Sequence, residues 1–331
     1  MDDLNTRQPA ESAFSAAPPV ARFRLTFEAL ETIPFPSYAG SAWRGLLGHG
    51  LRRLACVTRQ PTCEGCMLKY NCLYSTFFET PGAPEAASAR YAALPHPFVL
   101  EPEIRAEREI PSGGALRLGI TLIGAAAEQA PYLIHAMNLA GERGFGRAGG
   151  RFAVEALERE VLLGSETWDR VYEADTGEYQ RLGTQPVSFP PPPAAVRVRL
   201  MTPLRIKRHG HFVGGNDFEA GDFLRHLCTR LAMLAELYGG DPRPFQWESL
   251  LHHAQTIRVS APRLHWHEWT RFSSRQNTLM QMGGLLGSFL LEGPELETFW
   301  PALWLGQWVH VGKATSFGLG SYRLELDRSD S

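Results

Sequence analysis

The sequence lacks several features that would each place the protein in a broad functional class. The 331 residues contain no run of 18 or more apolar residues, which excludes a transmembrane helix. The first residues lack the positive segment and apolar run of a signal peptide, so we expect a cytoplasmic protein with no membrane partner. The net charge is −2 at pH 7, so no overall positive field favours nucleic acid. Any RNA-binding surface must therefore be local.

Cysteine is scarce, yet four of the five cysteines fall within one short segment. They are Cys56, Cys63, Cys66 and Cys72, and they include a C-x2-C pair. Thiolates at this spacing can converge on one metal ion or one iron–sulfur cluster, whereas disulfides would need an oxidising compartment. We expect a metal-binding insertion at about residues 55–80 that holds structural zinc, with an iron–sulfur cluster or free thiols as alternatives. Four thiolates would close the coordination sphere, so no catalytic metal is expected there.

Composition divides the remaining chain into two halves. Residues 1–20 are rich in Ala, Pro and polar groups and are predicted to be disordered. The run Phe189-Pro-Pro-Pro-Pro-Ala favours a stiff polyproline segment that cannot donate to a sheet. We therefore place a linker at 183–195, between an amino-terminal domain at 21–182 and a carboxyl-terminal domain at 196–326.

The two halves repeat one order of elements. Each begins with an alternating strand, continues with a helix and further strands, and ends with a helix, a glycine-rich loop and a strand. Phe145-Gly146 and Phe317-Gly318 lie 172 residues apart, and the two opening strands have about the same offset. This strand–helix–strands–helix–strand order is the split βαβ pattern, so we predict an α+β protein of tandem ferredoxin-like (RRM-like) domains. The predicted helices are 41–54, 128–139, 218–238 and 294–308, and the predicted strands include 22–30, 98–101, 115–124, 151–157, 196–204, 255–259 and 264–269.

The two glycine loops carry cations, which favours contact with a polyanion. The first contains Gly144, Gly146 and Gly149, and it formally matches the dinucleotide fingerprint G-x-G-x-x-G. That fingerprint follows a strand and opens a helix, whereas here a helix comes first, so the context excludes it. Two interpretations remain, tight turns that need positive φ or a backbone cradle for phosphates. The residues concerned also include Arg143, Arg147, Arg151, Gly312, Lys313, Gly318, Gly320 and Arg323.

At this point residues 20–325 resemble the RAMP superfamily, and more narrowly the CRISPR endoribonucleases that process precursor CRISPR RNA. The most diagnostic passage is His310-Val-Gly-Lys-Ala-Thr-Ser-Phe-Gly-Leu-Gly. The other matching passages begin at Pro203 (Pro-Leu-Arg-Ile-Lys-Arg-His-Gly-His-Phe-Val-Gly), Asp217 (Asp-Phe-Glu-Ala-Gly-Asp-Phe-Leu-Arg), Trp269 (Trp-Thr-Arg-Phe-Ser-Ser-Arg-Gln) and Met282 (Met-Gly-Gly-Leu-Leu-Gly). The cysteine segment resembles an insertion that only some members carry.

The resemblance implies binding and cleavage of CRISPR repeat RNA, which gives mature guide RNA. The neighbouring 2′-hydroxyl would attack without a catalytic metal, leaving a 2′,3′-cyclic phosphate. Such a reaction needs a general base, a general acid and cations. The family's catalytic histidine lies near the first helix, where His49 stands beside Tyr38 and Arg52, so these are the predicted catalytic residues. The alternatives are a surface role for His49, and an inactive subunit that binds CRISPR RNA within an effector complex.

The predicted RNA contacts are basic residues and their neighbours in both halves. The run Arg205-Ile-Lys-Arg-His-Gly-His is the densest basic stretch in the chain, with an ordinary solvated turn as its other interpretation. His265 and His267 alternate on a predicted strand, which favours a strand face over a metal pair. The full set is Arg44, Arg53, Arg143, Arg147, Arg151, Arg205, Lys207, Arg208, His209, His211, Arg271, Arg275, Lys313 and Ser316.

Overall fold

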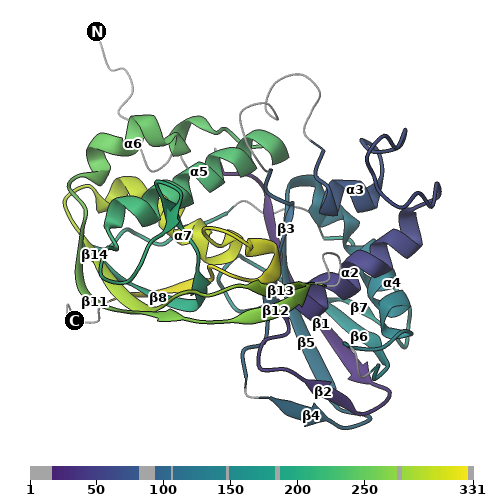
Figure 1. The fold of residues 1–331 in the computed structure, drawn as a ribbon. Coiled ribbons are helices and arrows are strands. Elements are labelled where there is room, and N and C mark those ends of the chain that lie inside the picture. The colour runs from purple at the N-terminus through teal and green to yellow at the C-terminus, as the bar shows by residue number, and fades with distance from the viewer. Residues whose placement is uncertain are drawn as a thin grey trace. The chain divides into compact units, whose positions relative to one another are not determined.

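The computed structural model describes residues 17–81, 94–105, 107–146, 149–182, 187–273 and 278–326. The chain divides into two compact units, an amino-terminal unit that spans Pro19–Val187 and a carboxyl-terminal unit that runs from Ser188. Figure 1 draws the first in purple to teal and the second in green to yellow. Within the described ranges, every helix is too short or too polar to cross a membrane.

The amino-terminal unit is built on a five-stranded antiparallel sheet with the order β3-β5-β1-β6-β7. Along the chain the elements follow the order β1, α2, β3, β5, α4, β6. The strands β3, β5, β1 and β6 therefore form the ferredoxin-like sheet, and β7 is added at the edge beside β6 (Figure 1). A small hairpin pairs β2 with β4. The bounds are β1 (Val20–Ala29), β2 (Ile33–Phe35), α2 (Gly40–Ala55), α3 (Leu73–Phe78), β3 (Phe98–Pro102), β4 (Arg108–Ile110), β5 (Ala115–Ile123), η1 (Gly124–Gln129), α4 (Ala130–Gly141), β6 (Phe152–Glu160) and β7 (Trp168–Glu173).

The carboxyl-terminal unit repeats the same topology. Its four-stranded antiparallel sheet has the order β11-β14-β8-β15, and the chain order is β8, α5, β11, β14, α7, β15. Two additional hairpins pair β9 with β10 and β12 with β13. The bounds are β8 (Ala195–Leu204), β9 (Lys207–Arg208), β10 (His211–Phe212), α5 (Ala220–Tyr238), η2 (Arg243–Phe245), α6 (Trp247–Ala254), β11 (Arg258–His267), β12 (Thr270–Ser273), β13 (Thr278–Gln281), β14 (Gly284–Glu292), α7 (Leu296–Val309), η3 (Thr315–Phe317) and β15 (Tyr322–Leu326).

Alternation along the first strand explains why the sheet of the amino-terminal unit has one buried face. Phe23, Leu25 and Phe27 are buried, whereas the residues between them are more exposed. An antiparallel sheet with helices on one side requires this pattern. The buried rings continue into α2, where Trp43 stacks on Phe27 with centroids 4.9 Å apart. The helix that carries His49 is therefore fixed to the centre of the sheet.

The predicted α+β fold of two ferredoxin-like units is confirmed. The two short strands expected at 255–259 and 264–269 are instead one strand, β11, whose pairing with β14 shifts between Ser260 and Arg263. Ala261 lies there at φ 44°, and this irregularity interrupts the alternation in the sequence. The helix expected from residue 128 begins as a 3₁₀ turn, η1, before α4 starts at Ala130.

Candidate functional site

Helix α2 places His49 on its exposed side, next to cations from two elements. Partial burial by its neighbours lowers the pKa of the His49 imidazole, and the positive charges of Arg143 and Arg52 lower it further. Arg52 is one turn along α2, whereas Arg143 belongs to the first glycine loop. The structure thus brings a neutral imidazole together with two guanidinium groups. A phosphate bound there would meet both positive charge and a proton acceptor.

The two arginines at the end of α2 already have partners. Arg52 donates hydrogen bonds to the carbonyls of Gln60 and Pro61, the latter at 2.8 Å from Nη2, and its guanidinium lies 5.5 Å from the ring centroid of Tyr74. Arg53 pairs with Glu142, with 2.8 Å between Nη1 and Oε2. Arg52 therefore joins α2 to the cysteine segment, a structural role that the sequence analysis did not predict for it.

The first glycine loop, residues 142–151 between α4 and β6, is anchored by an aromatic side chain. Phe145 is buried, with its ring centroid 4.9 Å from that of Trp43 and 5.1 Å from that of Phe35. Gly144 has φ 87°, and a Cβ there would lie 1.9 Å from the Gly149 carbonyl oxygen, so only glycine fits. Gly146 and Gly149 also have positive φ but open space around them.

The predicted cations of this loop differ in their surroundings. Arg143 is exposed, whereas Arg151 is held by Glu31 through its guanidinium at 2.7 Å and its backbone amide at 3.0 Å. Arg147 lies outside the described residues. The ion pair of Arg151 stabilises the end of the loop, and Arg143 is the cation whose charge reaches His49.

Tyr38 and Arg44 lie toward the opposite end of α2. Tyr38 precedes the helix and forms a bridge with Ile104, and burial raises the pKa of its hydroxyl. His49 is nine positions after Gly40, a rise of about 14 Å along a helix, so Tyr38 is not part of the His49 cluster. Arg44 Nη2 is 3.3 Å from His96 Nε2, and its guanidinium lies over the Phe78 ring.

In the carboxyl-terminal unit the basic run forms a hairpin. β9 and β10 pair around His209 and Gly210, which have φ 51° and φ 85°. His209 and His211 are exposed. Arg208 is neutralised by Glu219 at 2.7 Å and by Asp222 at 3.6 Å, so it contributes less free charge than the sequence suggests. The charged groups of Arg205 and Lys207 instead lie over the exposed aromatic ring of Phe212.

The second glycine loop, residues 310–321 between α7 and β15, occupies the position equivalent to the first. Gly312, Gly318 and Gly320 all have positive φ. The hydroxyl of Thr202 donates to the Gly318 carbonyl at 2.8 Å and accepts from the Ser321 amide at 2.9 Å, which fixes the loop to β8. Lys313 is exposed on this loop, whereas Ser316 is buried.

His226 on α5 is a residue near this loop that the sequence analysis missed. Its Nε2 accepts the Lys207 amide at 3.3 Å and its Nδ1 donates to the Asp222 carbonyl at 2.8 Å. Burial lowers the pKa of this imidazole, and the charges of Arg225 and Lys313 add to the effect. The sequence offered one signal for His226: it lies four residues after Asp222 in a predicted helix, so the two residues share a helix face. Of the two remaining predicted contacts, Arg271 lies on β12, and Arg275 is outside the described residues.

The cysteine segment joins α2 to α3 and brings its thiols near one another. The Thr58 hydroxyl is 3.9 Å from the Cys56 sulfur and 3.6 Å from the Cys66 sulfur. Burial raises the pKa of the Cys63 thiol, with negative charge on Glu79, Cys72 and Cys56 adding to the rise. Four thiol groups are donor types that suit zinc. In the described part of the chain, however, no three or more such side chains are arranged as a ligand set.

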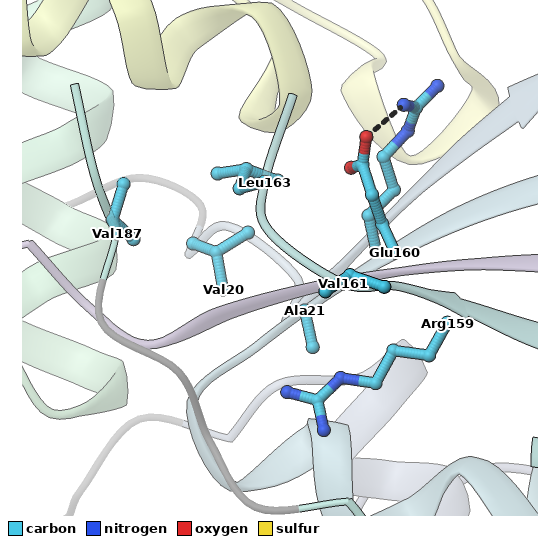
Figure 2. A pocket seen from close by; sticks show the side chains of 8 residues that line it. Val20, Ala21, Arg159, Glu160, Val161, Leu163 and Val187 are labelled. Atoms are coloured by element: carbon cyan, nitrogen blue, oxygen red, sulfur yellow. Dashed lines mark hydrogen bonds and ion pairs between the residues drawn. The ribbon is translucent and has the colours of Figure 1, made fainter. Parts of the chain in front are cut away.

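A separate hollow opens beside the start of β1 (Figure 2). It is lined by apolar side chains with Arg22, Arg159 and Glu160, and Arg22 pairs with Glu160 at 3.4 Å. Arg22 also pairs with Glu101 at 2.9 Å. Arg159 donates instead to the Leu182 carbonyl at 2.9 Å. None of the predicted site residues is among the described residues that line the hollow.

Comparison with known proteins identifies the family. Residues 198–322 match the model for the CRISPR-associated endoribonuclease Cas6, and residues 17–184 match the model AF_1859_N, described as an N-terminal domain. The chain belongs to the family of the AF_1859_N model, which covers half of it, and its carboxyl-terminal unit matches the Cas6 endoribonuclease model. The resemblance to CRISPR endoribonucleases that the sequence predicted is confirmed by this match.

The Cas6 fold extends over both units of the chain. Thermus thermophilus Cas6 is 16% identical with a TM-score of 0.52, and the match covers 94% of this chain and all of that one. A partial Cas6-RT-Cas1--Cas2 complex is 14% identical with a TM-score of 0.54; the match covers 96% of this chain but only 48% of that longer chain. An uncharacterized protein of Archaeoglobus fulgidus is 23% identical over 295 residues, covering 87% of this chain and 92% of that protein.

Proposed function

We propose that this chain binds CRISPR repeat RNA and cleaves it to give guide RNA. The observation that carries the proposal is the position of His49 on α2, where Arg143 from the glycine loop and Arg52 act on its imidazole. RNA cleavage by a neighbouring hydroxyl needs a proton acceptor and positive charge at one phosphate. The match of residues 198–322 to the Cas6 endoribonuclease model supports the substrate class.

In the proposed reaction His49 acts on protons and the arginines act on charge. The neutral imidazole takes the proton of the 2′-hydroxyl, whose oxygen attacks the adjacent phosphorus. The bond from phosphorus to the 5′-oxygen breaks, and that oxygen takes a proton from water while the His49 imidazolium returns its own proton to solvent. The products are a 2′,3′-cyclic phosphate and a 5′-hydroxyl. Arg143 stabilises the negative charge that develops on the phosphoryl oxygens. No metal takes part in this sequence of steps.

The test is incubation of the purified chain with the repeat RNA of its own locus in the presence of EDTA. We expect complete cleavage at one position, with a cyclic phosphate on one fragment and a free 5′-hydroxyl on the other, read by end-group analysis. Loss of activity in EDTA, with restoration by Mg²⁺, would contradict the proposal. Tight binding without any cleavage would instead favour the alternative, an inactive subunit that holds CRISPR RNA beside other effector subunits.

The lowered pKa of His49 predicts a specific pH dependence. A base with a lowered pKa stays unprotonated to a more acidic pH, so kcat/KM should fall only below the ordinary histidine range, about 6.5. Arg143→Gln removes one of the charges that lowers this pKa. The acidic limb of the kcat/KM profile should therefore move to higher pH in this variant.

The matched control is Arg170→Gln, which removes an exposed arginine from β7 of the same unit, where it pairs with Glu173. Its acidic limb should coincide with that of the unmodified chain. If Arg143→Gln also leaves the limb in place, the titrating group is not His49.

We infer that the four cysteines hold one structural zinc ion, because four thiols on one segment match its preferred ligands. The thiols would have to draw together from the arrangement described above, with Thr58 leaving its place between Cys56 and Cys66. Elemental analysis should find about one zinc per chain, and Cys63→Ser should lower that content. Cys228→Ser, which changes the buried thiol of α5, should not. Iron with sulfide would support the alternative cluster, and a chain free of metal would contradict both.

A further inference from the structure

Two aromatic side chains of the carboxyl-terminal unit lie exposed beside each other. Phe212 of β10 is 39% exposed and Trp266 of β11 is 38% exposed, and their ring centroids are 6.0 Å apart. They come from positions 54 residues apart, so the fold has brought them together. Contiguous exposed aromatic surface is uncommon on soluble proteins and marks interaction sites. We call this pair the aromatic platform.

Two cations accompany the aromatic platform. The Arg205 guanidinium carbon lies 4.5 Å from the centroid of the Phe212 ring, and the Lys207 amine nitrogen lies 4.9 Å from it. Lys207 is the direct partner of Phe212 across the β9–β10 hairpin. Cation–π contacts hold both positive groups at the Phe212 end of the platform. A surface that combines aromatic rings with cations suits a polyanion better than an apolar peptide.

Trp266 is held at its edge. Its indole Nε1 donates a 2.7 Å hydrogen bond to Glu268 Oε1. An N–H donates in the plane of the ring, so this bond does not occupy the indole face. Gly283 packs against the same ring, because a Cβ there would lie 3.0 Å from Trp266 Nε1. The Gly283 carbonyl also accepts a hydrogen bond from Arg205, so one glycine positions both the ring and the cation.

The aromatic platform is continuous with the second glycine loop. The Lys313 amide donates to the Arg205 carbonyl at 2.9 Å, and a Cβ at Gly312 would lie 2.5 Å from that carbonyl oxygen. The backbone of Arg205 thus fixes the loop on one side, while its side chain lies on Phe212. A nucleic acid that meets Lys313 on the loop therefore has the platform as its neighbouring contact.

We propose that the indole face of Trp266 stacks on an unpaired base of the bound RNA, while Arg205 and Lys207 neutralise the phosphates beside that base. Phe212 acts as a positioning residue that orders the two cations. The proposal rests on the proposed function, since it names the part of the RNA that this unit grips. Among the described residues, the acidic group that bonds to the platform is Glu268, which fixes the indole edge, and its negative charge also acts on Arg205.

The test compares Trp266→Leu with Trp266→Phe. Stacking on an aromatic ring is sequence-tolerant, and its loss should weaken binding of the own-locus repeat RNA by about fivefold to 100-fold in Trp266→Leu. Trp266→Phe should retain most of the affinity. The salt dependence of binding should stay unchanged in Trp266→Leu, whereas Lys207→Ala should reduce its slope by about one. The fluorescence of 2-aminopurine placed at each unpaired position should be quenched by the unmodified chain and not by Trp266→Leu.

The control is Leu251→Ala, which removes another exposed apolar side chain of the same unit, on α6. It should leave binding and quenching unchanged. If the unmodified chain binds and cleaves the RNA, and Trp266→Leu does so equally well, the platform proposal fails and the proposed function stands. Loss of affinity for a CRISPR protein subunit with unchanged RNA binding would also overturn it, in favour of a protein surface. If the unmodified chain binds no RNA, both proposals fail together.

Discussion

Replacing His49 by alanine should lower the rate of repeat-RNA cleavage by about 100-fold to 10,000-fold, the range that one positioned proton-transfer group contributes. RNA affinity should change little, because the cations that surround His49 remain. The measurement is single-turnover cleavage of the own-locus repeat RNA, paired with a binding titration on the same preparation. His49 is exposed on α2, so the substitution removes no core contact and the variant should fold normally.

The control for this substitution is His252→Ala, which removes an exposed histidine from α6. It should cleave at the unmodified rate. A His49→Ala variant that still cuts at that rate would remove His49 from the mechanism, and attention would pass to His226, the other histidine whose pKa is lowered beside a glycine loop.

The second large effect concerns Gly50, where α2 crosses α4. A Cβ at this position would lie 2.0 Å from the Ala136 carbonyl oxygen, so Gly50→Ala must force the two helices apart. We expect the free energy of unfolding to fall by about 3 kcal/mol or more, because backbone cannot move aside as a flexible side chain can. The measurement is denaturant unfolding followed by tryptophan fluorescence, with Trp43 buried on the same helix.

The same helix provides its own control. Gly45 has no atom within 4 Å of an added Cβ, so Gly45→Ala should raise the free energy of unfolding by about 0.5–1 kcal/mol through helix propensity alone. If the two alanine variants unfold at the same denaturant concentration, the close crossing of α2 and α4 is wrong.

The order of elements could be predicted from the sequence because it depends on local patterns. Alternation in β1 and helical spacing in α2 and α5 each report which side of an element is buried. The glycines inside α2 appeared only to weaken the helix, because nothing local reveals that α4 crosses at Gly50. A close approach between distant segments leaves no periodic signal in either segment.

The candidate site was predictable in its residue types and less so in its geometry. The charge of Arg143 acts on His49, although the sequence analysis assigned these two residues to separate features. Arg52, Arg151 and Arg208 looked like free cations, but each has a partner at a distance that sequence spacing cannot show. Trp266 and Phe212 were missed for the same reason, since their contact joins an edge strand to a hairpin.

The ring of Phe145 belongs to the hydrophobic core and to the first glycine loop at once. A sequence change that loosens that ring must alter both how firmly the unit holds together and where Arg143 lies. A substitution at Phe145 therefore cannot change the position of Arg143 without also changing the stability of the amino-terminal unit.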